Sequence, residues 1–120
     1  MSQNARITVR IRPAPTRLPL VLRGSDDQFL AVVEELTQRH GVLRARGWTI
    51  GEAAGLATKG AEREVRADQP RPELLAHHHA TAAHPDREAC GFDVSLPTQA
   101  SEALLLIRSR GRKHYFQVTV

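Results

Sequence analysis

Two hydrophobic segments flank a basic turn in ALLLIRSRGRKHYFQVTV, which occupies residues 103–120. Residues 104–107 are continuously apolar, whereas residues 114–120 alternate between two sets of side chains. Strict alternation is typical of a half-buried strand, and a short apolar run next to a turn is typical of a buried strand. Glycine within residues 110–113 suits a tight hairpin turn. The stretch therefore favours a C-terminal hairpin that pairs residues 103–109 with residues 114–120.

A helix is the alternative for the first half of this stretch. Thr98 would be its N-cap and Gly111 its C′ residue. Between them, one helical face would carry the apolar side chains Ala100, Ala103, Leu104 and Ile107. The apolar run is short and the final residues alternate cleanly, so the hairpin is the favoured interpretation.

The N-terminal region contains two further alternating segments, residues 6–12 and residues 17–23. Each places three aliphatic side chains on one face and mostly polar side chains on the other, which is the pattern of a half-buried strand. The prolines between them supply turn chemistry. We therefore predict an N-terminal hairpin, and Pro19 places its second strand at a sheet edge.

The next segment has the spacing of an amphipathic helix. Ser25 begins a capping box with Gln28, and the apolar side chains that follow recur every three or four residues: Phe29, Val32, Val33 and Leu36. Gly41 is a natural C-terminal stop. The pattern predicts one main helix over about residues 26–39.

The remaining segments complete a β-rich α+β fold. We expect strands at residues 42–50 and 91–96, with a loose glycine-rich connection after residue 50. Acids and bases alternate in residues 61–68, which suits an exposed strand or a solvated helical turn, and we predict a weak strand there. Residues 69–88 contain three prolines and form a surface excursion with a short helix at 73–83. A chain of 120 residues with 41% hydrophobic content supports one domain, residues 1–120.

Charge is segregated along the chain. Residues 1–25 carry five arginines and no acid, and residues 108–120 carry four bases and no acid. All 13 acids lie between residues 26 and 107. If the two ends meet in one sheet, the net charge of +4 conceals a strongly basic face, which is the electrostatic footprint of a polyanion-binding protein.

Such a face suggests single-stranded nucleic acid as the partner, because guanidinium groups neutralise phosphates and an aromatic ring stacks on a base. The candidate binding residues are Arg10, Arg12, Arg17, Arg23, Trp48, Arg110, Arg112, Lys113 and Tyr115. The ordinary alternatives are a solvated sheet face for the arginines and a place at the edge of the core for Trp48. A module that docks an acidic protein or its own copies through the same face is the other functional hypothesis.

Other function classes find little support in the sequence. No catalytic motif is present, so we expect no enzyme activity and no cofactor. His77, His78, His79, His84 and Cys90 lack the spacing of a metal site, since consecutive histidines point in different directions. A single cysteine and the lack of an apolar run of about 18 residues predict a cytoplasmic protein that does not enter a membrane.

Several segments together resemble the DdrB family of single-stranded-DNA-binding damage-response proteins of Deinococcus-type bacteria. They are the alternating N-terminal segments, QRHG at residues 38–41, GWTIGE at residues 47–52, and the basic C-terminal hairpin. The resemblance covers about residues 6–52 and 103–120, and residues 55–97 depart from it. It implies an OB-like β-rich fold, a homo-oligomeric (pentameric) ring, and binding and annealing of single-stranded DNA in DNA repair. By the same resemblance, Trp48 is a stacking or packing aromatic, and Arg110, Arg112 and Lys113 contact the DNA backbone.

Overall fold

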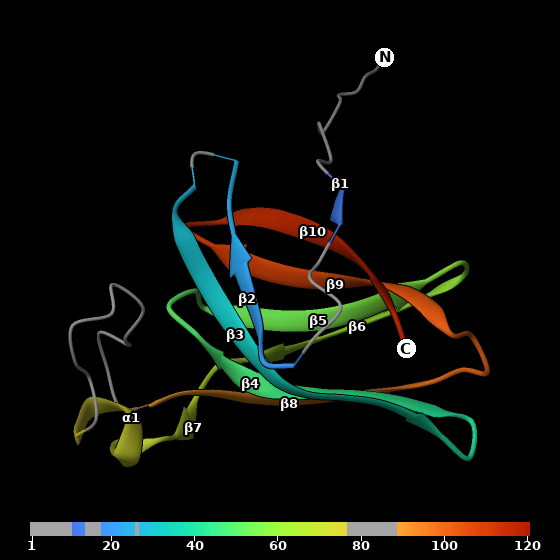
Figure 1. The fold of residues 1–120 in the computed structure, drawn as a ribbon, viewed down its shortest axis with the longest axis horizontal. Coiled ribbons are helices and arrows are strands. Elements are labelled where there is room, and N and C mark those ends of the chain that lie inside the picture. Colours follow the sequence, from blue (N-terminus) through green and yellow to red (C-terminus); the bar gives the residue numbers. More distant parts are fainter. Residues whose placement is uncertain (1–10, 14–17, 26, 77–88) are drawn as a thin grey trace.

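The chain forms two five-stranded sheets that lie one over the other (Figure 1). The computed structural model describes residues 11–13, 18–25, 27–76 and 89–120. Sheet A contains, in spatial order, β1 (Ile11–Pro13), β10 (Arg112–Thr119), β9 (Glu102–Ser109), β5 (Ala53–Thr58) and β6 (Ala61–Arg66). Sheet B contains β2 (Leu20–Arg23), β3 (Phe29–Arg39), β4 (Val42–Thr49), β8 (Ala89–Pro97) and β7 (Gln69–Pro70), and the short helix α1 (Pro72–Ala76) follows β7. All neighbouring strands are antiparallel except β1 and β10, which are parallel.

The predicted C-terminal hairpin is confirmed, and its helical alternative is wrong. Ser109 of β9 pairs with Arg112 of β10, so only Arg110 and Gly111 form the turn. Both turn residues have positive φ, 55° and 76°, as a type I′ turn requires. The turn follows the right-handed twist of the strands, and glycine takes its second position without strain.

The predicted main helix at residues 26–39 is wrong, and with it the α+β class, because residues 29–39 form the long strand β3. A two-residue turn with positive φ at His40 and Gly41 joins β3 to β4, so Gly41 closes a hairpin instead of ending a helix. The strand register shifts between Val33 and Glu35, which makes Glu34 the extra residue of a β-bulge. The bulge places Val33 and Leu36 on the same inner face, a three-residue spacing that imitates a helix.

The predicted N-terminal hairpin is also wrong. Within the described residues, β1 pairs with β10 in sheet A, whereas β2 pairs with β3 in sheet B. Alternation correctly identified β2 as a strand with one buried face, but it carries no information about which strand pairs with which. The predicted edge position of the second strand is confirmed, since β2 is an edge of sheet B.

The strands predicted at residues 42–50, 61–68 and 91–96 are confirmed as β4, β6 and part of β8. The glycine-rich connection after residue 50 is corrected, because most of it is strand β5, buried along almost its whole length. Of the predicted surface excursion, β7 and α1 are described, and residues 77–88 lie outside the described part. Among the described residues, no helix has the length and apolar character needed to cross a membrane.

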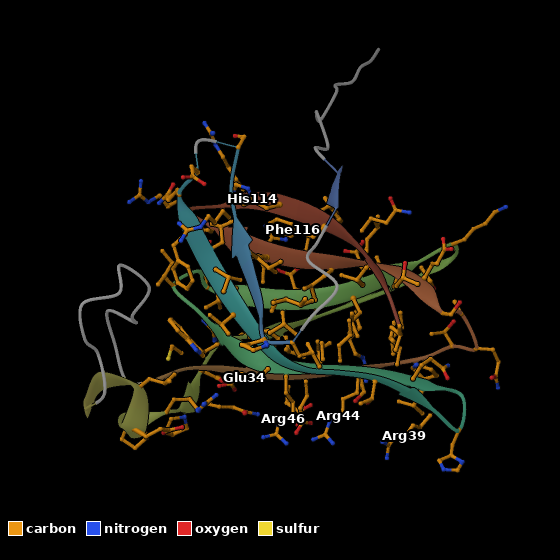
Figure 2. All side chains as sticks on the ribbon, in the orientation of Figure 1. Glu34, Arg39, Arg44, Arg46, His114 and Phe116 are labelled. Carbon is orange, nitrogen blue, oxygen red and sulfur yellow. The ribbon has the colours of Figure 1, made fainter. Side chains whose placement is uncertain are left out.

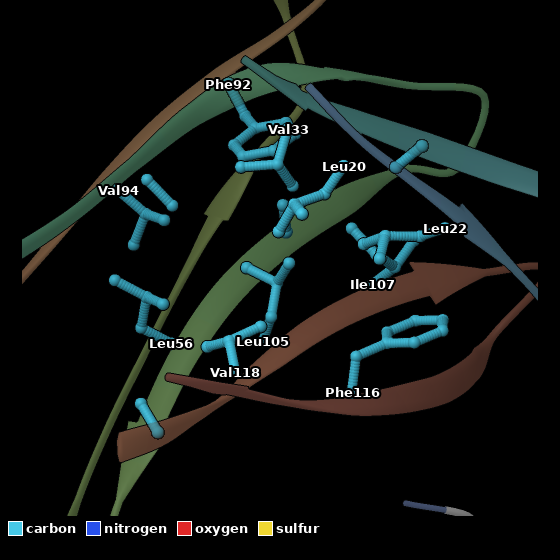
Figure 3. Close-up of a cluster of buried hydrophobic side chains, with 14 of the residues drawn as sticks. Leu20, Leu22, Val33, Leu56, Phe92, Val94, Leu105, Ile107, Phe116 and Val118 are labelled. Carbon is cyan, nitrogen blue, oxygen red and sulfur yellow. The ribbon is translucent and has the colours of Figure 1, made fainter. Parts of the chain in front are cut away.

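The main hydrophobic core lies between the two sheets (Figure 3). Sheet B contributes Leu20, Leu22, Val33, Phe92 and Val94, and sheet A contributes Leu56, Leu105, Ile107, Phe116 and Val118. Because alternate residues of each strand point into this core, the other half of each strand forms the two outer faces of the sandwich. Any ligand surface formed by the sheets is therefore one of these two faces or their rims.

Candidate nucleic-acid interface

The two Arg-rich ends of the chain meet at the edge of sheet A. Strand β1 lies parallel to β10, with Ile11 beside Tyr115, Arg12 beside Phe116 and Pro13 beside Gln117. This pairing joins residues 1–25, which contain no acid, to residues 108–120, which also contain none. A basic face required that both ends of the chain enter one sheet. The pairing of β1 with β10 meets this condition.

The outer face of sheet A follows from which residues of β10 are buried. Phe116 and Val118 point into the core, so Lys113, Tyr115, Gln117 and Thr119 point outward. The strand registers extend this outer face across the sheet to Leu104, Leu106 and Arg108 of β9, Ala53, Gly55 and Ala57 of β5, and Glu62, Glu64 and Arg66 of β6. The face therefore combines one aromatic ring, a central strip of small residues and charged groups of both signs.

The turn between β9 and β10 and the first residue of β10 form a basic tip, which consists of Arg110, Gly111 and Arg112. All three residues are exposed. The side chains of Arg110 and Arg112 have no ion-pair partner within the described part of the chain. Two guanidinium groups are thus held in solvent at the end of the hairpin. Arg112 alternates with the outward-facing Lys113, so it borders the outer face of sheet A without belonging to it. Arg66 borders an open depression beside this tip, together with Glu52 and Asp68.

A carboxylate fixes the conformation of the basic tip. Glu52, in the corner between β4 and β5, accepts hydrogen bonds from the backbone N–H groups of Arg110 and Gly111, each at 2.9 Å. The backbone N–H of Glu52 donates to the carbonyl oxygen of Arg108 at 2.9 Å. The hydrogen bond from the Gly111 N–H, followed by that from Arg110, lowers the pKa of Glu52 below its usual range. The corner and the tip therefore form one rigid unit.

The Glu52 contact predicts a pH dependence of stability. Because the folded state lowers the pKa of Glu52, the stabilisation is complete above the ordinary carboxyl pKa of about 4.3 and is lost as the pH falls through the folded-state value. In thermal melts, Glu52→Gln should have a lower Tm than the wild type at pH 7, and the two values should converge below about pH 4. Glu102→Gln, which changes an exposed acid of β9, is the control and should follow the wild type. A Tm difference that stays constant down to pH 3 would contradict the assignment.

Two cations on the outer face of sheet A are paired with acids of β6. Arg108 makes a two-pronged contact with Glu64, at 2.6 Å and 3.0 Å, and the Nζ of Lys113 lies 3.4 Å from Glu62. The Arg108 hydrogen bond lowers the pKa of Glu64. Sequence reasoning did not identify these acids as part of the face, because strand pairing alone brings β6 and β9 onto opposite sides of β5.

The other predicted binding residues are distributed elsewhere. Arg23 lies on β2 in sheet B, where its Nη1 donates to the carbonyl oxygen of Asp27 at 3.3 Å. Arg10 and Arg17 lie outside the described residues. The structure therefore brings together Arg110, Arg112, Lys113 and Tyr115, with the backbone of Arg12 beside them, and places Arg23 in the other sheet.

The sequence left two roles open for Trp48, packing at the edge of the core and stacking on a base. The structure shows a packed side chain. Its side chain is 5% exposed and lies 5.2 Å from the Phe29 ring, centroid to centroid, at an angle of 45°. Cys90 belongs to the same small cluster, and Leu74 of α1 packs against it. The cluster lies on the outer side of sheet B, since Trp48 alternates with the inward-facing residues of β4. A nucleic-acid base has no access to the indole ring in this conformation.

The neighbours of Trp48 in GWTIGE also have internal roles. A Cβ atom at Gly47 would lie 2.0 Å from the carbonyl oxygen of Val32, and one at Gly51 would lie 2.3 Å from that of Arg108. The buried Thr49 hydroxyl donates to the carbonyl oxygen of Leu30 at 2.6 Å and accepts from the Gly51 N–H at 2.9 Å. The string thus builds the corner that presents Glu52 to the basic tip.

The outer face of sheet B is charged but largely neutralised (Figure 2). Arg44 and Arg46 extend away from sheet A, as Figure 2 shows, and pair with Asp93 at 2.5 Å and Glu35 at 3.5 Å. Arg71 likewise bridges Glu34 at 2.9 Å and Glu73 at 2.6 Å. Arg39, close to the end of the β3–β4 hairpin, has no ion-pair partner among the described residues. Arg23 on β2 also has no ion-pair partner there. Sheet B thus has as many unpaired arginines as the basic tip, but they lie at opposite ends of β3, whereas Arg110 and Arg112 flank a single glycine.

Among the described residues, no three His, Cys, Asp or Glu side chains form a group that could hold a metal ion. His77, His78, His79 and His84 lie outside the described residues. No protein-family model, curated protein or solved structure matches this chain. The chemistry of the two outer faces is therefore the basis for a functional assignment.

Proposed function

We propose that this protein binds single-stranded DNA or RNA through the basic tip and the outer face of sheet A, and that it has no enzymatic activity. The observation that carries the proposal is the parallel pairing of β1 with β10, which unites the two acid-free ends of the chain. Arg110 and Arg112 then stand at the end of the hairpin that borders the outer face of sheet A, without ion-pair partners among the described residues.

The chemistry of the face suits a single strand. Guanidinium groups at the basic tip neutralise phosphates, and half-buried Tyr115 offers a ring on which a base can stack. The centre of the face is buried at Ala53, Ala57 and Leu106, so an unpaired strand would use the basic tip, Tyr115 and the cations that lie over the face. A duplex hides its bases in the stack and would use only the phosphate contacts.

The resemblance to the DdrB family supports a role in DNA repair or strand annealing, as a cytoplasmic homo-oligomer. An OB-fold is a five-stranded, partly open barrel. This chain instead forms two five-stranded sheets, so we place the ligand on a sheet face and not in the groove of an OB-like barrel.

Fluorescence anisotropy with a labelled oligo-dT, beside a duplex of equal length, tests the proposed function. We expect tighter binding of the single strand, part of which survives at near-physiological salt, because stacking does not depend on counterion release. Equal binding of both probes that disappears with added salt would reveal only a generic basic surface. No binding at low salt would refute the proposal.

A protein-interaction or self-assembly module is the second candidate, and one observation favours it. Strand β2 is an edge of sheet B, and it carries Val21, which is 40% exposed, close to Leu18, which is 49% exposed. Exposed apolar side chains on an edge strand are suited to adding a strand from another chain. Failure of the oligonucleotide assay at low salt would make this candidate the preferred one.

A further inference from the structure

We infer that Glu62 and Glu64 act as internal competitors for the ligand, which occupy Lys113 and Arg108 until a polyanion displaces them. The inference rests on the proposed function, and it assigns to β6 the control of affinity at that site. Both acids belong to the outer face of sheet A and come from its edge strand.

The geometry shows cations that reach across the sheet. Arg108 starts from β9, and its guanidinium crosses β5 to meet Glu64 with Nε at 2.6 Å and Nη2 at 3.0 Å. The register pairs Arg108 with Ala53 and Glu64 with Gly55, so the contact runs diagonally across β5. Lys113, one strand further away on β10, also turns toward β6 and Glu62 at 3.4 Å. Both cations therefore lie over the face instead of extending into solvent.

Partial exposure makes these contacts exchangeable. The side chains of Arg108 and Glu64 are 31% and 23% exposed, and those of Lys113 and Glu62 are 35% and 42% exposed. Ion pairs at such exposure contribute little to stability, so a phosphate that brings counterion release can replace the carboxylate. Because each carboxylate must first leave its cation, a phosphate gains less electrostatic energy at Arg108 or Lys113 than it would at an unpaired cation.

The C-terminal cations then fall into two classes. Arg110 and Arg112 are available to a phosphate at once, whereas Arg108 and Lys113 become available only after a carboxylate leaves. Removing the two acids should convert the second class into the first.

The test compares two double variants that each remove two ion-paired acids, one from each sheet. Glu62→Gln with Glu64→Gln acts on the outer face of sheet A, and Glu34→Gln with Glu35→Gln acts on sheet B, where the partners are Arg71 and Arg46. In oligo-dT anisotropy at 0.1 M salt, the sheet A variant should bind on the order of tenfold more tightly than the wild type. Its salt slope should steepen by about 1.4, or about 0.7 for each freed cation. The sheet B variant should change the affinity by about twofold or less, because charges beyond the Debye length of about 10 Å are screened.

A double-mutant cycle ties the effect to the partner. The gain from Glu64→Gln should vanish when Arg108→Gln is also present, which a general charge effect would not produce. Equal gains from the two double variants, or a gain from Glu64→Gln that survives Arg108→Gln, would overturn the inference while leaving the proposed function intact. A wild-type protein that fails to bind oligo-dT at low salt would instead refute the proposed function.

Discussion

Replacing Arg110, Arg112 and Lys113 together with alanine should weaken oligo-dT binding on the order of 100-fold at 0.1 M salt. The expected loss follows from three phosphate contacts, each of which contributes about 0.7 to the slope of log K against log salt. The slope should therefore decrease by about 2. The turn is held by backbone hydrogen bonds to Glu52, so the triple variant should keep its fold, which a thermal melt would verify.

The matched control removes three arginines from the opposite face, Arg39, Arg44 and Arg46, which extend from sheet B away from sheet A (Figure 2). Charge and side-chain volume change by a comparable amount, so a difference between the two triple variants reports the location of the ligand. The control should lose a few-fold in affinity and retain most of its salt slope. Equal losses from both faces would contradict the assignment of the ligand to sheet A.

Leu105→Ala should lower the free energy of unfolding by about 3 kcal/mol. Leu105 is fully buried, so truncating it removes the favourable transfer of its side chain from water and leaves a cavity in the core. Leu105 lies on β9, between β10 and β5, and points into the core between the sheets (Figure 3). For a chain of this size the Tm should fall on the order of 10 °C. Chemical denaturation and calorimetry measure the two quantities independently.

Leu18→Ala makes the same chemical change at a position that is 49% exposed. Exposed substitutions usually change stability by about 0.5 kcal/mol or less. If both variants lost equal stability, the two sheets would not enclose the core as described.

The C-terminal hairpin was predictable because its local signals agree. A short apolar run, a glycine-containing turn and a strictly alternating strand all point to the same structure, and Arg110 and Gly111 take the backbone angles that such a turn demands. The pairing of β1 with β10 meets the condition attached to the charge distribution, whereas Arg23, on β2, lies in the other sheet.

Strand β3 was not predictable from the spacing of its apolar residues. The bulge at Glu34 adds one residue between Val33 and Leu36, which converts the two-residue period of a strand into the three-residue spacing of a helix. Gly41 added to the error, because glycine ends helices and closes hairpins equally well. The apolar spacing and the glycine each fit two structures, an amphipathic helix with a C-terminal stop and a bulged strand that enters a hairpin turn.

For the candidate site, the sequence shows that the C-terminal cations lie together, but not which acids lie beside them. The basic tip is contiguous in sequence, whereas Glu52, Glu62 and Glu64 reach the same surface only through the pairing of β5 with β6 and β9. The order of strands in the sheet decides which charges lie close enough to neutralise each other. The alternation within a single strand does not reveal that order. The same limitation led us to pair β1 with β2.

The position of the single tryptophan gives the protein a built-in optical reporter for only one of its sheets. The emission of an indole ring depends on its solvent exposure, and Trp48 is buried on the outer side of sheet B in a cluster with Phe29 and Cys90, against which Leu74 of α1 packs. Its spectrum should report the docking of α1 and global unfolding, yet remain unchanged when a ligand without fluorescence settles on sheet A. Folding and ligand occupancy could thus be followed in the same sample as two independent signals.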